Sequence, residues 1–396
     1  MSQTQIESIL IRLLYLAGGL IVVFQGLGSL PLVSLCFTAT FFLVVLLWLC
    51  SLIRGIDRMD ALTLVILGLS LLSVALNAWQ TGTPMSFGYL KKLVMFICTV
   101  IFFQCAHKLR PDRAAVRFLG WLLTGLSLFL VGYYFLEPRY TFFMNRQVSQ
   151  YLTFRFTNPN LCALFLLCLY MAQLLLLLDA SGKGRRFFHE CVAGAMLYFL
   201  YRTQSRNALL AAITVTGIYL LILLRRSPFR ISAWYALPVA VLPLVFVFIY
   251  VAVIDNEMVR DMFAFMDSEG KELNTRLVVW LPALEHFADS PLIGAYSQIS
   301  EGTGMSQMHN SHLDVLAGYG APVLVLVCVL LFLFIRGHRD SVSRHNTAAR
   351  IFFSGTLLIG LGEAALFSGG LGIYIFAGLF LLLTDPGKQP QGEARP

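Results

Sequence analysis

Residues 30–53 read LPLVSLCFTATFFLVVLLWLCSLI and contain no charged side chain. A run of about 20 apolar residues is long enough to cross the hydrocarbon core of a bilayer as one helix. The same composition extends through the chain of 396 residues, of which 58% are hydrophobic and 13% are charged. The mean hydropathy is +0.76. A soluble fold cannot hide so much apolar surface, so the sequence predicts an all-α polytopic membrane protein.

Apolar stretches long enough, or nearly long enough, to span the membrane predict about twelve transmembrane helices. They lie at about 9–25, 30–53, 61–77, 88–106, 114–136, 160–178, 187–201, 207–224, 233–254, 321–335, 351–366 and 369–384. No small-residue cleavage site follows the first stretch, so we expect a retained span rather than a signal peptide. The eight cysteines all fall in apolar runs, which indicates small buried side chains rather than disulfides or a metal site.

The stretch 255–320 is the only long hydrophilic segment and divides the chain into three parts. We expect helices 1–9 in 1–254, an external loop with short helices in 255–320, and helices 10–12 with a cytoplasmic tail in 321–396. Within the loop, residues 256–266 have the spacing of an interfacial amphipathic helix. Asn274 is placed to cap a further helix over 275–288.

The net charge of +8 is distributed unevenly among the loops. Most basic residues lie near the two termini and in every second loop, which predicts that these segments and both termini are cytoplasmic. The basic residues outside that set are Lys91, Lys92, Arg139, Arg146, Arg155, Arg202, Arg206, Arg260, Lys271 and Arg276. We expect them on the external face, where they need an anionic partner. In a membrane protein the net charge of +8 indicates asymmetric loop charge rather than nucleic-acid binding.

Arg202 and Arg206 flank a tight turn expected at 202–206 between two apolar stretches. They are four residues apart, and on a helix they would share a face. A charge at membrane depth is costly unless it is compensated, and a phosphate or diphosphate can compensate it through paired hydrogen bonds. Snorkelling of the side chain to the interface is the alternative for each. Arg276, at the start of the expected loop helix, is a second cation on the same side. It would stabilise the negative charge that develops on a diphosphate as that group departs.

Two histidines end the long loop, in the sequence HNSHLD at 309–314. His309 suits proton abstraction near pH 7. His309, His312 and Asp314 together are an alternative metal site, although no strong zinc spacing is present. A third alternative is a structural histidine at a helix start. Glu363 is an intramembrane carboxylate that would pair with an arginine or orient a histidine.

Four motifs occur in order, namely FTNPNLCA at 156–163, TQSRNALL at 203–210, TRLVVW at 275–280 with SPLIG at 290–294, and HNSHLD at 309–314 ahead of Gly320. Their order, and the long loop before the last spans, resemble the O-antigen ligase and polymerase superfamily of bacterial inner membranes. The resemblance covers about 155–385. It implies a GT-C-type glycosyltransferase with an undecaprenyl-diphosphate-linked glycan donor, a periplasmic site and, in the ligase branch, a lipid A–core oligosaccharide acceptor.

The resemblance places the family's essential residues on Arg206, Arg276 and His309. We expect substrate contacts from Arg202, Arg155, His312, Asn160 and Glu363. Ligases often carry an acidic residue two positions after the histidine, where this chain has Ser311. The expected reaction inverts the anomeric centre and uses neither nucleotide, divalent metal nor other cofactor.

Three alternatives stay open at this point. The chain would act as an O-antigen polymerase if the acceptor were a second lipid-linked glycan, or as an oligosaccharyltransferase if it were a protein Ser or Thr. A transporter of the lipid-linked glycan is the alternative from another class. That function predicts internal repeats and charged residues near the midplane of the bilayer. The basic residues left unexplained here are instead expected at one face of the membrane.

Overall fold

The computed structural model describes residues 3–82, 87–108, 112–136, 142–144, 147–149, 151–156, 159–224, 233–253, 274–295, 308–337 and 344–361. The helices are α1 (Gln3–Gly26), α2 (Leu30–Ile53), α3 (Arg58–Thr81), α4 (Phe87–Lys108), α5 (Arg113–Leu136), α6 (Pro159–Leu178), α7 (Lys183–Arg202), α8 (Arg206–Leu224), the 3-10 turn η1 (Ala233–Tyr235), α9 (Ala236–Val253), α11 (Asn274–Asp289), α13 (Ser311–Tyr319), α14 (Ala321–Gly337) and α15 (Arg344–Ile359). Strands β1 (Phe142–Met144) and β2 (Gln147–Ser149) form an antiparallel pair with Phe143 opposite Val148.

Eight of the described helices, α1–α6, α8 and α9, are long and apolar enough to cross a membrane. The apolar helices α14 and α15 are shorter. Helix α7 is less apolar because its first turn carries Lys183, Arg185 and Arg186. These helices confirm a multi-pass membrane protein. The expected twelfth span, 369–384, lies outside the described residues.

Local sequence sets where several helices begin and end. Pro31 lies in the first turn of α2, where its missing N–H costs no hydrogen bond. The Asp57 side chain caps α3 by accepting from the backbone N–H groups of Met59 and Asp60. Helix α3 ends at Gly82, whose φ of 62° is left-handed and suits glycine.

The expected loop helix is confirmed, since α11 begins at Asn274 and ends at Asp289. Three local features differ from expectation. Helix α15 begins at Arg344 rather than near 351 because its polar first turn carries no apolar signal. Helix α13 lies where short helices were expected but its bounds were not predicted, and the β1–β2 hairpin was not expected. The segment 256–266, expected as an amphipathic helix, lies outside the described residues.

The first five helices share a polar end, defined by ion pairs. Arg54 at the end of α2 pairs with Glu7 of α1, and Arg12 of α1 pairs with Asp112 ahead of α5 at 3.4 Å. The same end of the bundle is closed by Lys108, the last residue of α4. Its ammonium contacts the carboxylates of Asp57 and Asp60 at the start of α3.

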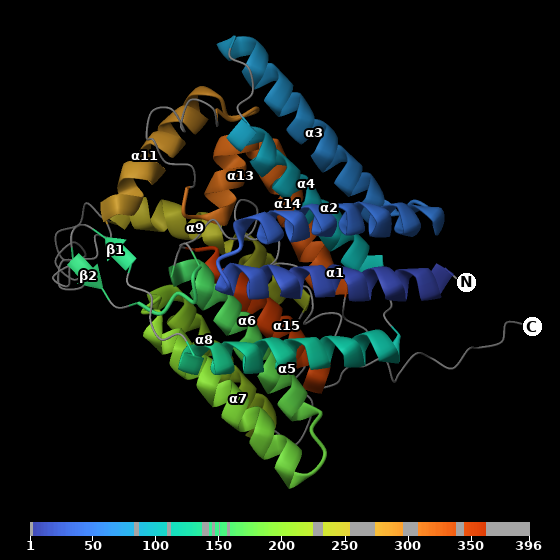
Figure 1. The fold of residues 1–396 in the computed structure, drawn as a ribbon. Coiled ribbons are helices and arrows are strands. Elements are labelled where there is room, and N and C mark those ends of the chain that lie inside the picture. Colours follow the sequence, from blue (N-terminus) through green and yellow to red (C-terminus); the bar gives the residue numbers. More distant parts are fainter. Residues whose placement is uncertain are drawn as a thin grey trace, which may run out of the picture.

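The opposite end of the bundle gathers the elements that carry the candidate site. The Tyr134 and Tyr198 hydroxyls, near the ends of α5 and α7, lie 3.4 Å apart. Asn77 near the end of α3 donates to the carbonyl of Ile293, which follows α11. Figure 1 places α11 and the β1–β2 hairpin together at the end of the bundle away from the N-terminus.

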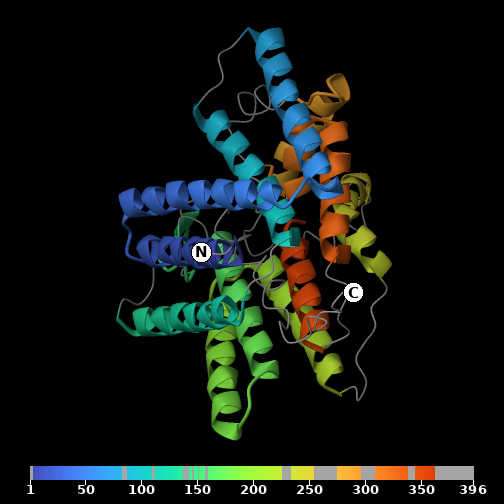
Figure 2. The same ribbon diagram turned by 90° about the vertical axis from the view of Figure 1, so that its right-hand side faces the viewer.

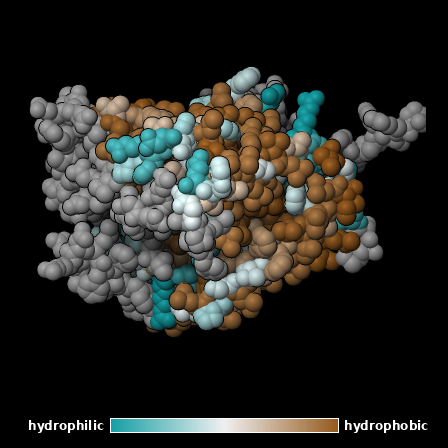
Figure 3. Space-filling model, turned by 90° about the horizontal axis from the view of Figure 1, so that it is seen from above, coloured by the Kyte–Doolittle hydropathy of each residue, from teal (hydrophilic) through white to brown (hydrophobic). Residues whose placement is uncertain are grey.

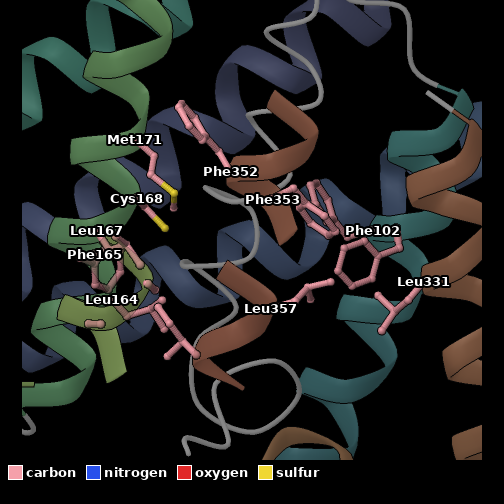
Figure 4. Close-up of a cluster of buried hydrophobic side chains, with 14 of the residues drawn as sticks. Phe102, Leu164, Phe165, Leu167, Cys168, Met171, Leu331, Phe352, Phe353 and Leu357 are labelled. Carbon is pink, nitrogen blue, oxygen red and sulfur yellow. The ribbon is translucent and has the colours of Figure 1, made fainter. Parts of the chain in front are cut away.

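Helices α2, α1 and α5 lie side by side with α1 in the middle, as Figures 1 and 2 both show. A second layer is built around α15. In Figure 4, Phe352, Phe353 and Leu357 of α15 lie between α6 on one side and Phe102 and Leu331 on the other. All five of these side chains are buried. The described surface seen in Figure 3 is largely hydrophobic, as a bilayer-facing surface requires.

Candidate functional site

His309 occupies a strained backbone position. Its φ is 49°, and it directly precedes α13. In the described part of the chain, the residues other than glycine with positive φ are Phe154, Arg155, Gln204 and His309, and all four belong to the end of the bundle opposite the ion pairs. Such a conformation costs about 1–3 kcal/mol and persists only where neighbouring contacts hold it. The contacts around His309 therefore decide its position.

Asn310 fixes the turn on its C-terminal side. Its side-chain amide donates to the carbonyls of Pro243 in α9 (2.8 Å) and Leu361 after α15 (3.1 Å). Its oxygen accepts from the N–H groups of His312 (3.0 Å) and Leu313 (2.9 Å), which caps α13. The residue is 0% exposed. One buried amide thus joins three helices beside His309.

Met308 fixes the turn on its N-terminal side. Its N–H donates to Asp314 Oδ1 at 3.0 Å, and its carbonyl accepts from Trp280 Nε1 at 2.7 Å. Trp280 is fully buried in α11, one turn after Arg276. The bond therefore connects the helix that carries Arg276 directly to the turn that carries His309. The side chain of Arg276 is outside the described residues.

The His312 side chain is buried in the interior. Its Nε2 lies 2.6 Å from the carbonyl of Ala240 in α9 and it is 1% exposed. Burial lowers the pKa of His312 to about 4, so the ring is neutral near pH 7 and Nε2 carries the proton that it donates. Nδ1 is buried and has no hydrogen-bond partner among the described residues. His312 thus anchors α13 to α9.

Arg202 and Arg206 do not share a helix face, because they flank the tight turn that was expected at 202–206. Arg202 is the last residue of α7 and Arg206 is the first of α8. Between them Thr203 turns its hydroxyl back to the carbonyl of Leu200 (2.7 Å), and Gln204 takes a φ of 55°. Together these features accompany the sharp turn between the end of α7 and the start of α8. Arg206 is exposed at the N-terminus of α8.

The Arg202 side chain packs against a cluster of aromatic side chains. Its Nη1 donates to the Tyr198 hydroxyl at 2.9 Å, and its guanidinium lies 5.9 Å from the centre of the same ring. Tyr134 packs edge-on against Tyr198. The Arg202 carbonyl accepts from the N–H of Leu152, so the segment 151–156 is tied to the end of α7.

The same segment is tied to the end of α1 through Arg155. Its Nη1 donates to the carbonyl of Leu27 at 3.0 Å, and its own carbonyl accepts from Gln25 Nε2 at 3.3 Å. A cation at a helix C-terminus complements the helix dipole. The Arg155 side chain is thus engaged with α1, a role that its sequence position did not indicate.

The remaining expected residues lie as follows. Asn160 is the second residue of α6 and is half-buried. Lys92, in the first half of α4, interacts electrostatically with Asp314. Glu363 is outside the described residues. Within the residues that the structure covers, no group of three His, Cys, Asp or Glu side chains is placed to hold a metal ion, and Asp314 is bound to the Met308 N–H.

Residues 191–328 match a protein-family model described as O-antigen ligase. This match covers about a third of the chain and supports a member of the O-antigen ligase and polymerase superfamily. Searches of curated proteins and of solved structures gave no match. The matched family implies a general role in glycosyl transfer, with lipid-linked glycan and lipid substrates, in lipopolysaccharide biosynthesis.

The part that matches the superfamily runs from α7 into α14 and includes Arg206, Arg276 and His309. The Trp280–Met308 bond lies inside it as well, and the sequence analysis included Trp280 only as the last residue of the motif TRLVVW. A usable signal was present, because a buried tryptophan N–H normally finds an acceptor. The acceptor itself was not predictable, since it is a main-chain carbonyl 28 positions away.

Proposed function

We propose that this superfamily member is an O-antigen ligase that transfers a glycan from undecaprenyl diphosphate to lipid A–core oligosaccharide. In this proposal it has twelve spans and the GT-C architecture, lies in the bacterial inner membrane with both termini cytoplasmic, and acts at the periplasmic face. One observation carries the assignment of the site. His309 is held in a strained conformation by contacts from α9, α11 and α15, within the part of the chain that matches the O-antigen ligase family.

Arg206 and Arg276 hold the donor's diphosphate. Arg206 stands at the N-terminus of a helix of 19 residues, where free backbone N–H groups and the helix dipole also favour an anion. Arg276 lies in the first turn of α11. Arginine forms paired hydrogen bonds to phosphate oxygens. Together they stabilise the negative charge that grows on the diphosphate as it departs.

His309 acts on the acceptor. It takes the proton of the acceptor sugar hydroxyl as that oxygen bonds to the anomeric carbon, and the bond from that carbon to the diphosphate oxygen breaks with its electron pair. Undecaprenyl diphosphate leaves. A single displacement inverts the anomeric centre. The proposed reaction requires no divalent metal, and full activity in EDTA is expected.

Purified protein with donor and acceptor tests the site. His309→Ala should lower the transfer rate by about 10²–10⁴-fold, the range for loss of a general base. Arg206→Ala and Arg276→Ala should each lower it by about 10²–10³-fold, as for loss of one charge-stabilising donor. Arg336→Ala, an exposed arginine at the opposite end of the bundle, is the matched control and should be near wild type. Folded variants of His309 or Arg206 with normal rates would refute the site.

The acceptor is tested separately in a deletion strain. Loss of an O-antigen ligase leaves full-length glycan on the carrier and none on lipid A–core. Loss of a polymerase leaves lipid A–core capped with single repeats, and loss of a protein oligosaccharyltransferase leaves lipopolysaccharide unchanged. Absence of any transfer by active, folded protein in vitro would favour a transporter.

A further inference from the structure

Helix α4 turns one face of its first half toward α13. Tyr89, Lys92 and Phe96 follow one another at intervals of three and four residues, which places them on the same side of α4. The Phe96 ring stacks on the Tyr319 ring of α13, with 4.6 Å between the two centres. Tyr89 also interacts electrostatically with Tyr319. In Figure 1, α13 accordingly lies beside α4 at this end.

Lys92 acts on Asp314 across the contact between these two helices. Asp314 lies in the first turn of α13 and is 6% exposed. A carboxylate with so little access to water is costly unless a positive charge compensates it. Lys92 is half-buried and interacts electrostatically with Asp314. The compensating charge therefore comes from a helix that is distant in sequence.

The same carboxylate holds the backbone ahead of His309. Asp314 Oδ1 accepts the Met308 N–H at 3.0 Å. Hydrogen bonds to an ionised acceptor are about twice as strong as those between neutral groups. Lys92 thus balances the negative charge on which the strength of this bond depends. Its charge reaches the His309 turn through one intermediate side chain.

We propose that Lys92 is a positioning residue for the transfer reaction, which balances the charge of Asp314 so that Asp314 can hold the His309 turn in place. The effect on rate rests on the proposed function, whereas the effect on the turn does not. The alternative is direct contact of Lys92 with the donor's diphosphate. The two roles differ in kinetics, because a displaced catalytic group lowers kcat and a lost ground-state contact raises the KM for the donor.

Hydrogen exchange of the full-length protein in detergent measures the turn itself. Lys92→Met keeps the length of the side chain but removes its charge. The Met308 amide should then exchange faster by about tenfold or more, as for loss of one hydrogen bond to a charged group. Lys92→Arg keeps the charge and should keep the protection. Lys91→Met is the matched control, since Lys91 is the exposed neighbour on α4, and it should leave the Met308 amide as protected as in wild type.

A pair without charges separates charge compensation from packing. Asp314→Asn keeps an oxygen for the Met308 N–H and needs no cation. The double variant Lys92→Met with Asp314→Asn should therefore protect the turn better than Lys92→Met alone. If Lys92→Met does not fold, the double variant should restore a folded protein. A double variant that improves neither protection nor folding overturns the proposal.

The transfer assay then distinguishes the two roles of Lys92. Lys92→Met should lower kcat by about tenfold or more, as for a catalytic group displaced by about 1 Å, with the donor KM near wild type. Wild-type exchange of the Met308 amide in Lys92→Met overturns the proposal. Together with a raised donor KM, it would assign Lys92 to the diphosphate. If the proposed function itself is wrong, the wild type shows no transfer, but the exchange results still decide the link from Lys92 to the turn.

Discussion

At the scale of single residues, His312 shows how burial sets a charge state. Its folded-state pKa of about 4 lies below the value of about 6.5 for an unperturbed histidine. The unfolded chain therefore binds more protons between pH 6.5 and pH 4. Stability should fall as the pH drops through this window, by up to about 3 kcal/mol, and should be unaffected above it.

Replacement of His312 tests this linkage. His312→Gln keeps a donor for the Ala240 carbonyl but cannot be protonated. The variant should lose less thermal stability than wild type between pH 6.5 and pH 4, measured by unfolding in detergent. His286→Gln, a half-buried position on α11, is the control and should follow the wild-type curve. If the curves of stability against pH were parallel for all three proteins, His312 would not be buried in its neutral form.

Residue type predicted the candidate chemistry but not the conformations that organise it. Arg206 and Arg276 stand out because they are charged residues beside apolar stretches. His309 stands out because a histidine can take up a proton near pH 7. The positive φ of His309 and Gln204 was not predicted from the sequence, since this conformation is uncommon for residues other than glycine. It arises from contacts such as that of Asn310 with two carbonyls that are distant in sequence.

At the scale of elements, the bond from Trp280 to the Met308 carbonyl connects α11 to the His309 turn. Trp280→Phe removes the N–H but keeps a ring against Tyr250, whose centre lies 5.4 Å away. We expect the transfer rate to fall by about tenfold or more, because a shift of about 1 Å in a catalytic group is costly. The KM for the donor should change little.

A double-mutant cycle checks that Trp280 acts through His309. In a His309→Ala background, Trp280→Phe should have no further effect on residual transfer. Independent effects that multiply would contradict the coupling. Hydrogen exchange gives a readout without activity, and the peptide containing Met308 should exchange faster in Trp280→Phe. Trp79→Phe, at a 79% exposed position, should change neither measurement.

The connection between α11 and α13 depends on a glycine. Gly294 has a φ of 67°, and a Cβ there would lie 2.6 Å from the Ala317 carbonyl oxygen. Gly294→Ala should therefore lower the free energy of unfolding by about 1–3 kcal/mol or more. Gly217→Ala in α8 meets nothing within 4 Å and should stabilise by about 0.5–1 kcal/mol. Equal melting temperatures for the two variants would contradict this packing.

The elements that the sequence predicted best are those with long apolar runs. Helices α1 to α6, α8 and α9 follow from hydropathy alone because the bilayer forces their backbone into helices. The bounds of α13 were not predicted because its nine residues are all buried and carry no periodic pattern. The tight turn between Arg202 and Arg206 was expected, but its backbone conformation, with the positive φ of Gln204, was not.

At the scale of the whole molecule, the bundle has two chemically different ends. One end carries the ion pairs of Arg12, Arg54 and Lys108, and the other carries α11, α13 and the start of α8. The alternation of the helices makes this separation unambiguous, and the positive-inside rule assigns the first end to the cytoplasm.

Cysteine labelling in intact cells tests the orientation. In a background without the eight native cysteines, Gln204→Cys and Tyr151→Cys should react with an impermeant thiol reagent added to the periplasm. Ile56→Cys, an exposed position between α2 and α3, should react only after the cells are lysed. Labelling of Ile56→Cys in intact cells would invert the topology and remove the candidate site from the periplasm.

The His309 turn is held mainly by hydrogen bonds to backbone carbonyls, those of Pro243, Gly360 and Leu361. Every amino acid supplies the same carbonyl, whatever its side chain. Saturation mutagenesis should therefore find Leu361 broadly permissive and Asn310 intolerant, because the donor at Asn310 is a side chain that no other residue reproduces. Mutational robustness of this candidate site would then depend on the course of the surrounding backbone more than on the identity of the residues along it.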